Sequence, residues 1–380
     1  NVNDEKIDQF YLIKIIFSSF DKFELKEEFH ITNQKLFLFL ADISKTYKRS
    51  GFHTWKHAVD MLQFVAFVVS KIDVHFEKYE ILALFVASVC HDAGHDDFEK
   101  LKIENNRSRV PFEILYRAQS VEEMKNVEFA IRTISKDECN LFSVLDYNIQ
   151  KQIWRLIINM ILGTSIRDHF KFMDSVNQLF VNKKFDVENK KKRHVLLILL
   201  MKCAVFSSLA RNFDIAQLSV EQIVNEFWLL GKSEKCTGLK YYVDDHTLNR
   251  GRSLPAILNS VVLPTFETFS ATVNDSMKMV VESLKNNIQK FTEITKEKYK
   301  EEEEKERKIE EERKRKEEEE RIKKEEEERK RKEEEERKRK EEEERKRKEE
   351  EEKKRKEEEE RKRKEEEEKR KKEEEERIKK

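Results

Sequence analysis

The scarcity of glycine and proline constrains the fold of this chain more than any other feature of its sequence. The 380 residues contain only six glycines and three prolines, and all of them lie before residue 290. Sheet proteins need such residues in their turns, whereas helix interiors exclude them. The sequence therefore predicts an all-α protein.

Composition divides the chain into two unlike parts. Residues 1–290 hold every cysteine and almost all aromatic residues, which is enough for one large hydrophobic core. The 26 phenylalanines recur at helical spacing, as is typical of core packing. We therefore expect a multi-helix domain over residues 1–290 and a low-complexity helical tail, rich in Glu, Lys and Arg, over residues 291–380.

Apolar periodicity predicts where the helices of the domain lie. We expect helical segments over residues 4–29, 32–47, 55–72, 79–90, 112–115, 121–134, 149–162, 170–181, 194–210, 220–230 and 254–291. The polar segment 97–111 and the segment 231–252, which holds three glycines, are expected to be loops.

The tail repeats four glutamates and four basic residues with a period of eight residues from about Lys296 onward. Glu followed four residues later by Lys or Arg is the favoured orientation for ion pairs on a helix surface, and all three are good helix formers. Apolar a and d positions are absent, which excludes an ordinary coiled coil. The repeat predicts an isolated charged helix, roughly 120 Å long, that serves as a semi-rigid spacer and can contact protein partners. A frayed tail without a specific role is the alternative.

Charge and hydropathy exclude several classes of partner. Lys plus Arg and Asp plus Glu both number 79, so the net charge favours neither nucleic acid nor an anionic membrane. The longest apolar runs, 81–90 and 195–206, are shorter than the roughly 20 residues that span a bilayer, and we expect no signal peptide. The chain begins with Asn rather than Met, as a fragment of a longer protein would.

The four cysteines indicate a reducing compartment. Cys90, Cys139, Cys203 and Cys236 lack the spacing of a metal finger, and two of them lie in apolar helical runs. Buried free thiols are the expected state, which favours the cytoplasm.

Two short stretches carry the residues with catalytic potential. Residues 52–60 read FHTWKHAVD, and His53 and His57 share one face if the segment is helical. Residues 91–96 read HDAGHD, with His91 next to Asp92 and His95 four residues after His91. Imidazole and carboxylate groups in such clusters suit Zn²⁺, Mg²⁺ or Mn²⁺. Each stretch adjoins an apolar helical run, so both can project into one pocket.

The order of these stretches resembles the class I cyclic nucleotide phosphodiesterases, metal-dependent phosphohydrolases with an all-helical domain of the His-Asp type. The resemblance runs from about Ile31 to about Ser270 and includes DECNLF at 137–142, KCA at 202–204 and LPTFETF at 263–269. It implies hydrolysis of a 3′,5′-cyclic nucleotide to the 5′-monophosphate in cyclic nucleotide signalling. It also implies two divalent metal ions, zinc together with magnesium or manganese, as cofactors.

The resemblance assigns roles to the histidines and to one aspartate. His57, His91 and Asp92 match protein ligands of the family's first metal, and Asp92 also matches the residue that bridges to the second metal. His53 matches the general acid, which gives a proton to the departing oxygen. The alternative is that these residues are inherited and kept by packing or hydrogen bonding.

Further matches concern the surroundings of the second metal. His95 and Glu123 match groups that hold water there, and Thr164 matches a threonine that lines the same region. His169 and His194 have no such match and are expected to be ordinary, partly buried histidines.

The chain departs from the family pattern around the metals. Val205 stands where the family has an aspartate as fourth ligand of the first metal, and valine has no lone pair to donate. Lys202 replaces the histidine that precedes this motif, Lys125 and Asn126 replace paired histidines, and Ser165 replaces an aspartate. Such groups orient metal ligands, so we expect a weakened first site.

The pocket for the base is altered as well. Leu254 stands at the position of the glutamine that binds the purine edge, Ile257 replaces the phenylalanine that stacks on the base, and Ser208 replaces an asparagine. Leucine cannot make the contacts of an amide, and isoleucine cannot stack as an aromatic ring does. We expect such a site to bind cyclic nucleotide poorly and to discriminate little.

Three functions are compatible with these features. The first is hydrolysis of 3′,5′-cyclic nucleotides, and the second is a catalytically impaired pseudo-phosphodiesterase that binds or scaffolds partners. The third is metal-dependent hydrolysis of another phosphate compound, because the altered pocket no longer demands a cyclic purine nucleotide.

Overall fold

The computed structural model describes residues 9–49, 51–94, 121–180, 189–237 and 254–378. Within these ranges the chain consists of helices joined by turns, and an isolated bridge between Lys48 and Thr54 is the extent of β pairing. The prediction of an all-α protein is therefore confirmed.

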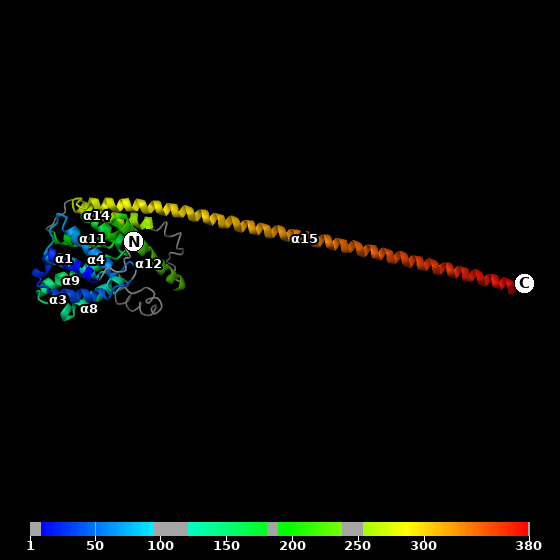
Figure 1. The fold of residues 1–380 in the computed structure, drawn as a ribbon, viewed down its shortest axis with the longest axis horizontal. Coiled ribbons are helices and arrows are strands. Elements are labelled where there is room, and N and C mark those ends of the chain that lie inside the picture. Colours follow the sequence, from blue (N-terminus) through cyan, green and yellow to red (C-terminus); the bar gives the residue numbers. More distant parts are fainter. Residues whose placement is uncertain (1–8, 50, 95–120, 181–188, 238–253, 379–380) are drawn as a thin grey trace. The chain divides into compact units, whose positions relative to one another are not determined.

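The helices follow one another along the chain as Figure 1 shows. The α-helices are Gln9–Lys22 (α1), Leu25–Glu28 (α2), Asn33–Ser44 (α3), Trp55–Val69 (α4), Lys78–Cys90 (α5), Val121–Ile134 (α8), Tyr147–Gly163 (α9), His169–Phe180 (α10), Lys190–Val205 (α11), Phe213–Thr237 (α12), Leu263–Thr272 (α14) and Lys278–Ile378 (α15). Two 3₁₀ segments, Asp137–Cys139 (η2) and Ser207–Ala210 (η3), and one π-helical turn, Leu258–Val262 (η4), complete the list.

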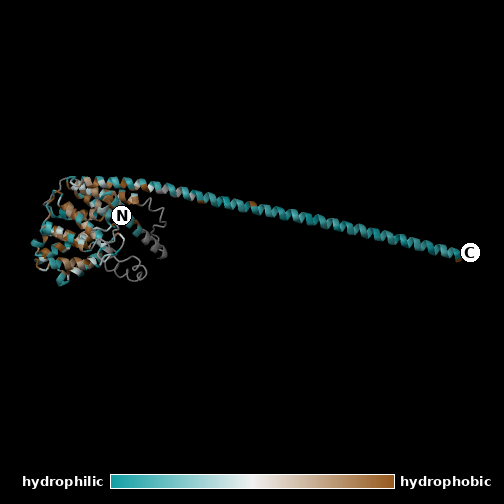
Figure 2. Cartoon of the chain, in the orientation of Figure 1, coloured by the Kyte–Doolittle hydropathy of each residue, from teal (hydrophilic) through white to brown (hydrophobic). Residues whose placement is uncertain are grey.

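The chain separates into two units, Asn1–Lys300 and Glu301–Lys380. The first unit holds the hydrophobic core, and Figure 2 shows apolar residues throughout it. The second unit is helical and hydrophilic along its length. Helix α15 begins in the first unit, where Leu284 and Ile288 are buried. Its described side chains in the second unit are exposed, apart from the half-buried Glu310.

Helix α5 lies at the centre of the core. Every residue from Glu80 to Cys90 is buried, and the helix packs against α4 and α9. A helix that is buried on all sides must be apolar around its whole circumference, so this run lacks an amphipathic pattern. A capping box between Glu77 and Glu80 fixes its first turn.

A buried ion pair joins the start of α5 to the start of α11. Glu80 is fully buried and accepts hydrogen bonds from Arg193 Nε at 3.2 and 3.1 Å. Burial disfavours the charged carboxylate, yet the neighbouring His194 and the Arg193 guanidinium outweigh it and lower the pKa of Glu80. The pair fixes the relative position of two helices, and breaking such a pair typically costs about 3–5 kcal/mol.

Most expected helices are found with small shifts at their ends, and 121–134 agrees at both ends. The loop expected from Gly231 is wrong at its start, because α12 continues through Gly231 to Thr237. One glycine costs a helix only about 1 kcal/mol, which the residues on both sides can offset. The expected helix 194–210 is divided into α11 and η3. The segments 97–111 and 112–115 lie outside the described residues.

Two further expectations concern the cysteines and membranes. Cys90, Cys139 and Cys203 are buried free thiols, as expected. No helix in the described part of the chain is both long and apolar enough to cross a membrane.

The charged helix carries ion pairs between residues four apart. In representative pairs Lys316 Nζ lies 2.8 Å from Glu312, and Lys340 Nζ lies 2.8 Å from Glu336. Each repeat of eight residues rotates the charge pattern by about 80° around the helix axis. Acidic and basic blocks therefore spiral around the helix, and no face of it keeps a single sign.

We predict that a peptide of residues 301–380 is a helical monomer in dilute buffer, because its many exposed pairs each contribute about 0.2–0.5 kcal/mol. Circular dichroism and sedimentation equilibrium measure the two properties. The matched control has the same composition with all glutamates placed before all basic residues, which removes most of the pairs, and it should be markedly less helical. Equal helicity of the two peptides would contradict the role of the pairs.

Candidate metal centre

His57 lies in the first turn of α4, where the chain is held by a helix cap. The Thr54 hydroxyl accepts a hydrogen bond from the His57 backbone N–H at 3.4 Å, which sets the start of the helix. The Phe52 ring packs against the His57 ring with centroids 4.2 Å apart. His57 is 7% exposed, so the cap and the aromatic contact hold its imidazole inside the protein.

His91 and Asp92 come at the end of α5. His91 is the C-cap residue of that helix, and its Nδ1 donates to the Ser88 carbonyl at 3.0 Å. A carbonyl only accepts, so Nδ1 carries the proton, and the lone pair of neutral His91 lies on Nε2. This is the second-sphere arrangement that commonly orients a histidine ligand.

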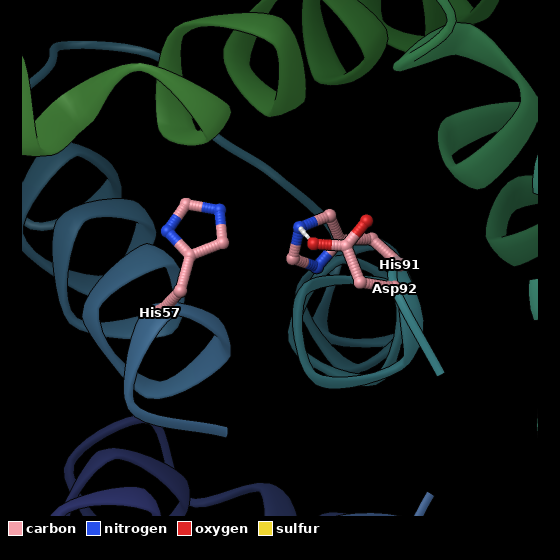
Figure 3. A group of neighbouring side chains, drawn as sticks. All are labelled: His57, His91 and Asp92. Carbon is pink, nitrogen blue, oxygen red and sulfur yellow. Dashed lines mark ion pairs between the residues drawn. The ribbon is translucent and has the colours of Figure 1, made fainter. Parts of the chain in front are cut away.

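The three side chains converge on one point, as Figure 3 shows. One ligand atom each from His57, His91 and Asp92 can be chosen so that all lie within 4.8 Å of one another. His91 Nε2 and Asp92 Oδ2 are 2.7 Å apart without the geometry of a hydrogen bond. These two atoms and His57 Nε2 are buried and have no hydrogen-bond partner among the described residues.

The electrostatics favour the protonation states that a metal ion requires. Burial, reinforced by His91, lowers the pKa of His57 to about 3, so this imidazole is neutral at pH 7. Burial alone would raise the pKa of Asp92, but the adjacent imidazoles of His91 and His53 outweigh it and hold that pKa well below its usual range. Neutral imidazole and ionised carboxylate are the forms that bind metal.

The donor set fits a divalent cation. Two imidazole nitrogens and one carboxylate oxygen match the three protein ligands found in many catalytic zinc sites, and they also suit other first-row dications. Buried polar atoms without partners are rare and call for an explanation. A cation between them supplies it, so the group can hold a metal ion.

Neighbouring segments support the turn that follows α5. Gly94 has a φ of +74°, and a Cβ at this position would lie 2.1 Å from the Phe129 ring, so no larger residue fits. Its N–H donates to the Thr46 carbonyl at 3.2 Å, and the hydroxyl of buried Tyr47 donates to the Val89 carbonyl at 2.8 Å. The Asn126 side chain donates to the His91 carbonyl. Contacts with Thr46, Tyr47 and Asn126 thus hold the backbone around the end of α5.

His53 lies beside this group and is held by a glutamate that the sequence analysis did not identify. Glu226 on α12 lies 2.9 Å from His53 Nδ1, 2.8 Å from Lys48 Nζ and 2.9 Å from the Phe52 N–H. Burial lowers the pKa of His53, but Asp92 and Glu226 outweigh it, so the net pKa is raised. Glu226 is separated from His53 by 173 positions, and no local sequence pattern identifies Glu226 as a site residue.

The other matched residues lie near this centre or outside the described residues. Glu123 is half-buried in the first turn of α8, one turn before Asn126. Thr164 is the C-cap of α9, and its hydroxyl donates to the Ile161 carbonyl at 2.7 Å. His95 lies outside the described residues. The roles assigned to these three residues stay predictions.

The residues that depart from the family pattern have definite places in the structure. Val205 is the last residue of α11 and is half-buried against the core. Lys202 is 4% exposed and donates to the Ser165 carbonyl at 2.9 Å. Ser208 is buried, and Lys125 is half-buried on α8.

The two residues expected in the base pocket are less enclosed. Leu254 is half-buried against the core, and Ile257 is 38% exposed at the start of η4. His169 is more buried than expected, with 2% exposure, and burial beside Lys202 lowers its pKa to about 4. His194 is half-buried beside Glu80, as expected.

Comparison with known proteins agrees with this architecture. The model of the 3'5'-cyclic nucleotide phosphodiesterase family matches residues 52–284, which is more than half of the chain. The chain is 24% identical over 293 residues to the 3',5'-cyclic-nucleotide phosphodiesterase regA of Dictyostelium discoideum, covering 75% of this chain and 37% of that protein. It is 24% identical over 276 residues to the human high affinity cGMP-specific 3',5'-cyclic phosphodiesterase 9A, covering 72% and 46%. The chain thus spans less than half the length of these relatives.

A solved structure has a similar fold. The phosphodiesterase domain of Salpingoeca rosetta rhodopsin phosphodiesterase matches with a TM-score of 0.72 at 22% identity, covering 78% of this chain and 91% of that one. At this identity the likeness concerns the fold. The family match over residues 52–284 includes His53, His57, His91 and Asp92. The chain therefore belongs to the 3'5'-cyclic nucleotide phosphodiesterase family.

Proposed function

We propose that this chain binds a divalent cation through His57, His91 and Asp92 and hydrolyses a 3′,5′-cyclic nucleotide to the 5′-monophosphate. One observation carries the proposal: three buried ligand atoms without hydrogen-bond partners lie within 4.8 Å of one another. An imidazole–carboxylate pair, His53 with Glu226, lies beside them. Family membership supports the same chemistry.

Each residue of the proposed site has its own role in this hydrolysis. A bound divalent cation would supply the activation of water and the neutralisation of phosphate charge. When the bond between phosphorus and the 3′-oxygen breaks, the 3′-oxygen is a poor leaving group unless it receives a proton. His53 is the proton donor, and Glu226 orients its ring and stabilises its charged form. His57 stays neutral, and Asp92 supplies the negative charge.

A pseudo-phosphodiesterase that binds partners is the second candidate function. Val205, Leu254 and Ile257 are apolar where the resemblance expects an aspartate, a glutamine and a phenylalanine. A cation can still be held by three ligands, whereas discrimination between bases needs directed polar contacts. Metal binding without turnover of any cyclic nucleotide would favour this candidate.

The charged helix and the compartment form a separate part of the proposal. Residues 301–380 act as a semi-rigid spacer that reaches protein partners, which their mixed charges and continuous helix support. Three buried free thiols support a reducing compartment, the cytoplasm.

The first prediction concerns the metal ligands. His91→Ala should lower Mn²⁺ affinity by more than about 100-fold, because losing a direct ligand costs more than losing an outer-sphere partner. Cyclic AMP and cyclic GMP hydrolysis should be lost with it. Isothermal titration and a turnover assay measure the two effects. The exposed His75→Ala is the matched control and should change neither; unchanged metal affinity in His91→Ala would rule out the proposed site.

The second prediction concerns pH. A proton donor such as His53 is active below its pKa and loses its proton as the pH rises above that pKa. Turnover should therefore fall at alkaline pH. Glu226→Gln removes a charge that stabilises the His53 imidazolium, which lowers the pKa of His53 and moves the alkaline limb to lower pH. The pH profile of kcat and the NMR titration of the His53 ring measure this shift.

The exposed Glu221→Gln on the same helix is the control for that experiment, and it should leave the profile in place. An alkaline limb that does not move in Glu226→Gln would mean that His53 is not the titrating donor.

The third prediction concerns the missing ligand. Val205→Asp should tighten metal binding at least about tenfold, equivalent to about 1.4 kcal/mol, if position 205 faces the cation. Val205→Asn is the control, because asparagine has nearly the same shape as aspartate but no negative charge. It should gain much less metal affinity. Isothermal titration with Zn²⁺ and Mn²⁺ compares the variants, and equal affinities in all three proteins would remove Val205 from the site.

A further inference from the structure

The first turns of α15 belong to the domain and hold the backbone of η3 and of the residue that follows it. Asn287 is 4% exposed, and its side-chain amide donates to the carbonyls of Leu209 and Arg211, both at 2.8 Å. The Ser283 hydroxyl, one turn earlier on α15, donates to the Arg211 carbonyl at 3.4 Å. The Asn287 amide is thus a donor for two backbone acceptors, and a side chain without N–H groups would leave both acceptors without it.

Side chains of the same segment, residues 207–211, are bonded to α4, the helix that carries His57. Arg211 Nη2 donates to Asp60 Oδ1 at 2.6 Å, and the hydroxyl of buried Ser207 donates to Asp60 Oδ2 at 3.4 Å. Asp60 lies three residues after His57, so the two side chains share one face of α4. The segment that fixes Asp60 therefore also fixes the part of α4 from which His57 reaches the metal centre.

The bond between Arg211 and Asp60 is the strongest of these contacts, because both of its groups carry a charge. Their side chains are 35% and 30% exposed, so water competes with the pair only in part. Burial raises the pKa of Asp60, and the Arg211 guanidinium opposes this change. Without Arg211 the Asp60 carboxylate would turn toward water or take up a proton, and either change would weaken the attachment of α4 to residues 207–211.

We infer that Asn287, near the start of the long C-terminal helix, is a positioning residue of the metal centre. Asn287 holds the backbone of Arg211, and the Arg211 side chain holds Asp60 on the face of α4 that also carries His57. A binding site keeps its geometry to within about 0.5 Å when its ligands are supported in this way. The inference rests on the proposed metal centre, and it gives the first turns of α15 a role in supporting that centre.

The test compares the Mn²⁺ affinities of full-length variants by isothermal titration, after circular dichroism has established that each variant is folded. Arg211→Met should lower the affinity about tenfold, the lower end of the range for partners that orient metal ligands. Asn287→Leu should lower it as well, by at most the same factor, because Asn287 acts through Arg211. Asn286→Leu is the matched control: it makes the same substitution at the adjacent, exposed position and should leave the affinity unchanged.

A double-mutant cycle distinguishes this path from a general loss of stability. The double variant of Arg211→Met and Asn287→Leu should bind Mn²⁺ no more weakly than Arg211→Met alone, because the second change acts through a side chain that is already missing. Arg211→Lys keeps the positive charge and should recover part of the lost affinity. Asn287→Ala removes the same N–H groups without a bulkier apolar side chain, and it replaces Asn287→Leu in the cycle if that variant is unfolded.

The possible results separate the inference from the proposed function. Unchanged Mn²⁺ affinity in a folded Asn287 variant would overturn the inference and leave the proposed function intact. Additive losses in the double variant, or an Arg211→Lys protein as weak as Arg211→Met, would exclude the path through the Arg211–Asp60 pair. If the unaltered chain bound no Mn²⁺, both the inference and the proposed function would be wrong.

Discussion

The burial of the ionised Asp92 carboxylate beside the imidazoles of His57 and His91 is the interaction on which the rest of this structure depends. Removing Asp92 from water is costly, and such a charge persists in a protein interior only when something compensates it. The fold places His91 and Asp92 at the end of α5, the most enclosed helix of the core, and brings His57 to them from α4. The apolar residues of α5 and the Glu80–Arg193 pair that anchors its start serve this placement.

Local pattern predicts the parts of this arrangement that are close in sequence. His57 lies four residues after His53, and His91 is adjacent to Asp92, so the members of each pair are close because they are close in sequence. The expected shared helix face is not what joins the first pair, because α4 begins at Trp55, after His53. The two pairs meet because α4 packs against α5. The apolar runs in the sequence indicate that both helices are buried, but they do not show which residues of the two helices touch. The same reasoning explains why the helices were largely predictable, because their periodicity is a local property.

The features that could not be predicted depend on distant contacts. Glu226 reaches His53 across 173 positions and lies in a helix whose sequence gives it no special mark. The extension of α12 through Gly231 depends on a small cost that neighbouring residues offset, and single-residue propensities do not reveal that balance. The bond from Lys202 to Ser165 joins α11 to the end of α9, so the two substitutions appear unrelated in the sequence.

The contact between Lys202 and Ser165 helps to decide whether the residues that depart from the family pattern arose by loss of function without selection. Random loss of function would leave unrelated substitutions at separate places, whereas Lys202 and Ser165 touch each other and Asn126 still holds the His91 carbonyl. Burying the Lys202 ammonium against a backbone carbonyl is costly, so a chain free of constraint would readily replace this lysine with an apolar residue. The groups nearest the proposed reaction, namely His53, Glu226 and the three metal donors, remain together and mutually supported. Under the proposed function, selection for a cation at this site, with relaxed demands on the base of the substrate, would account for both halves of the pattern.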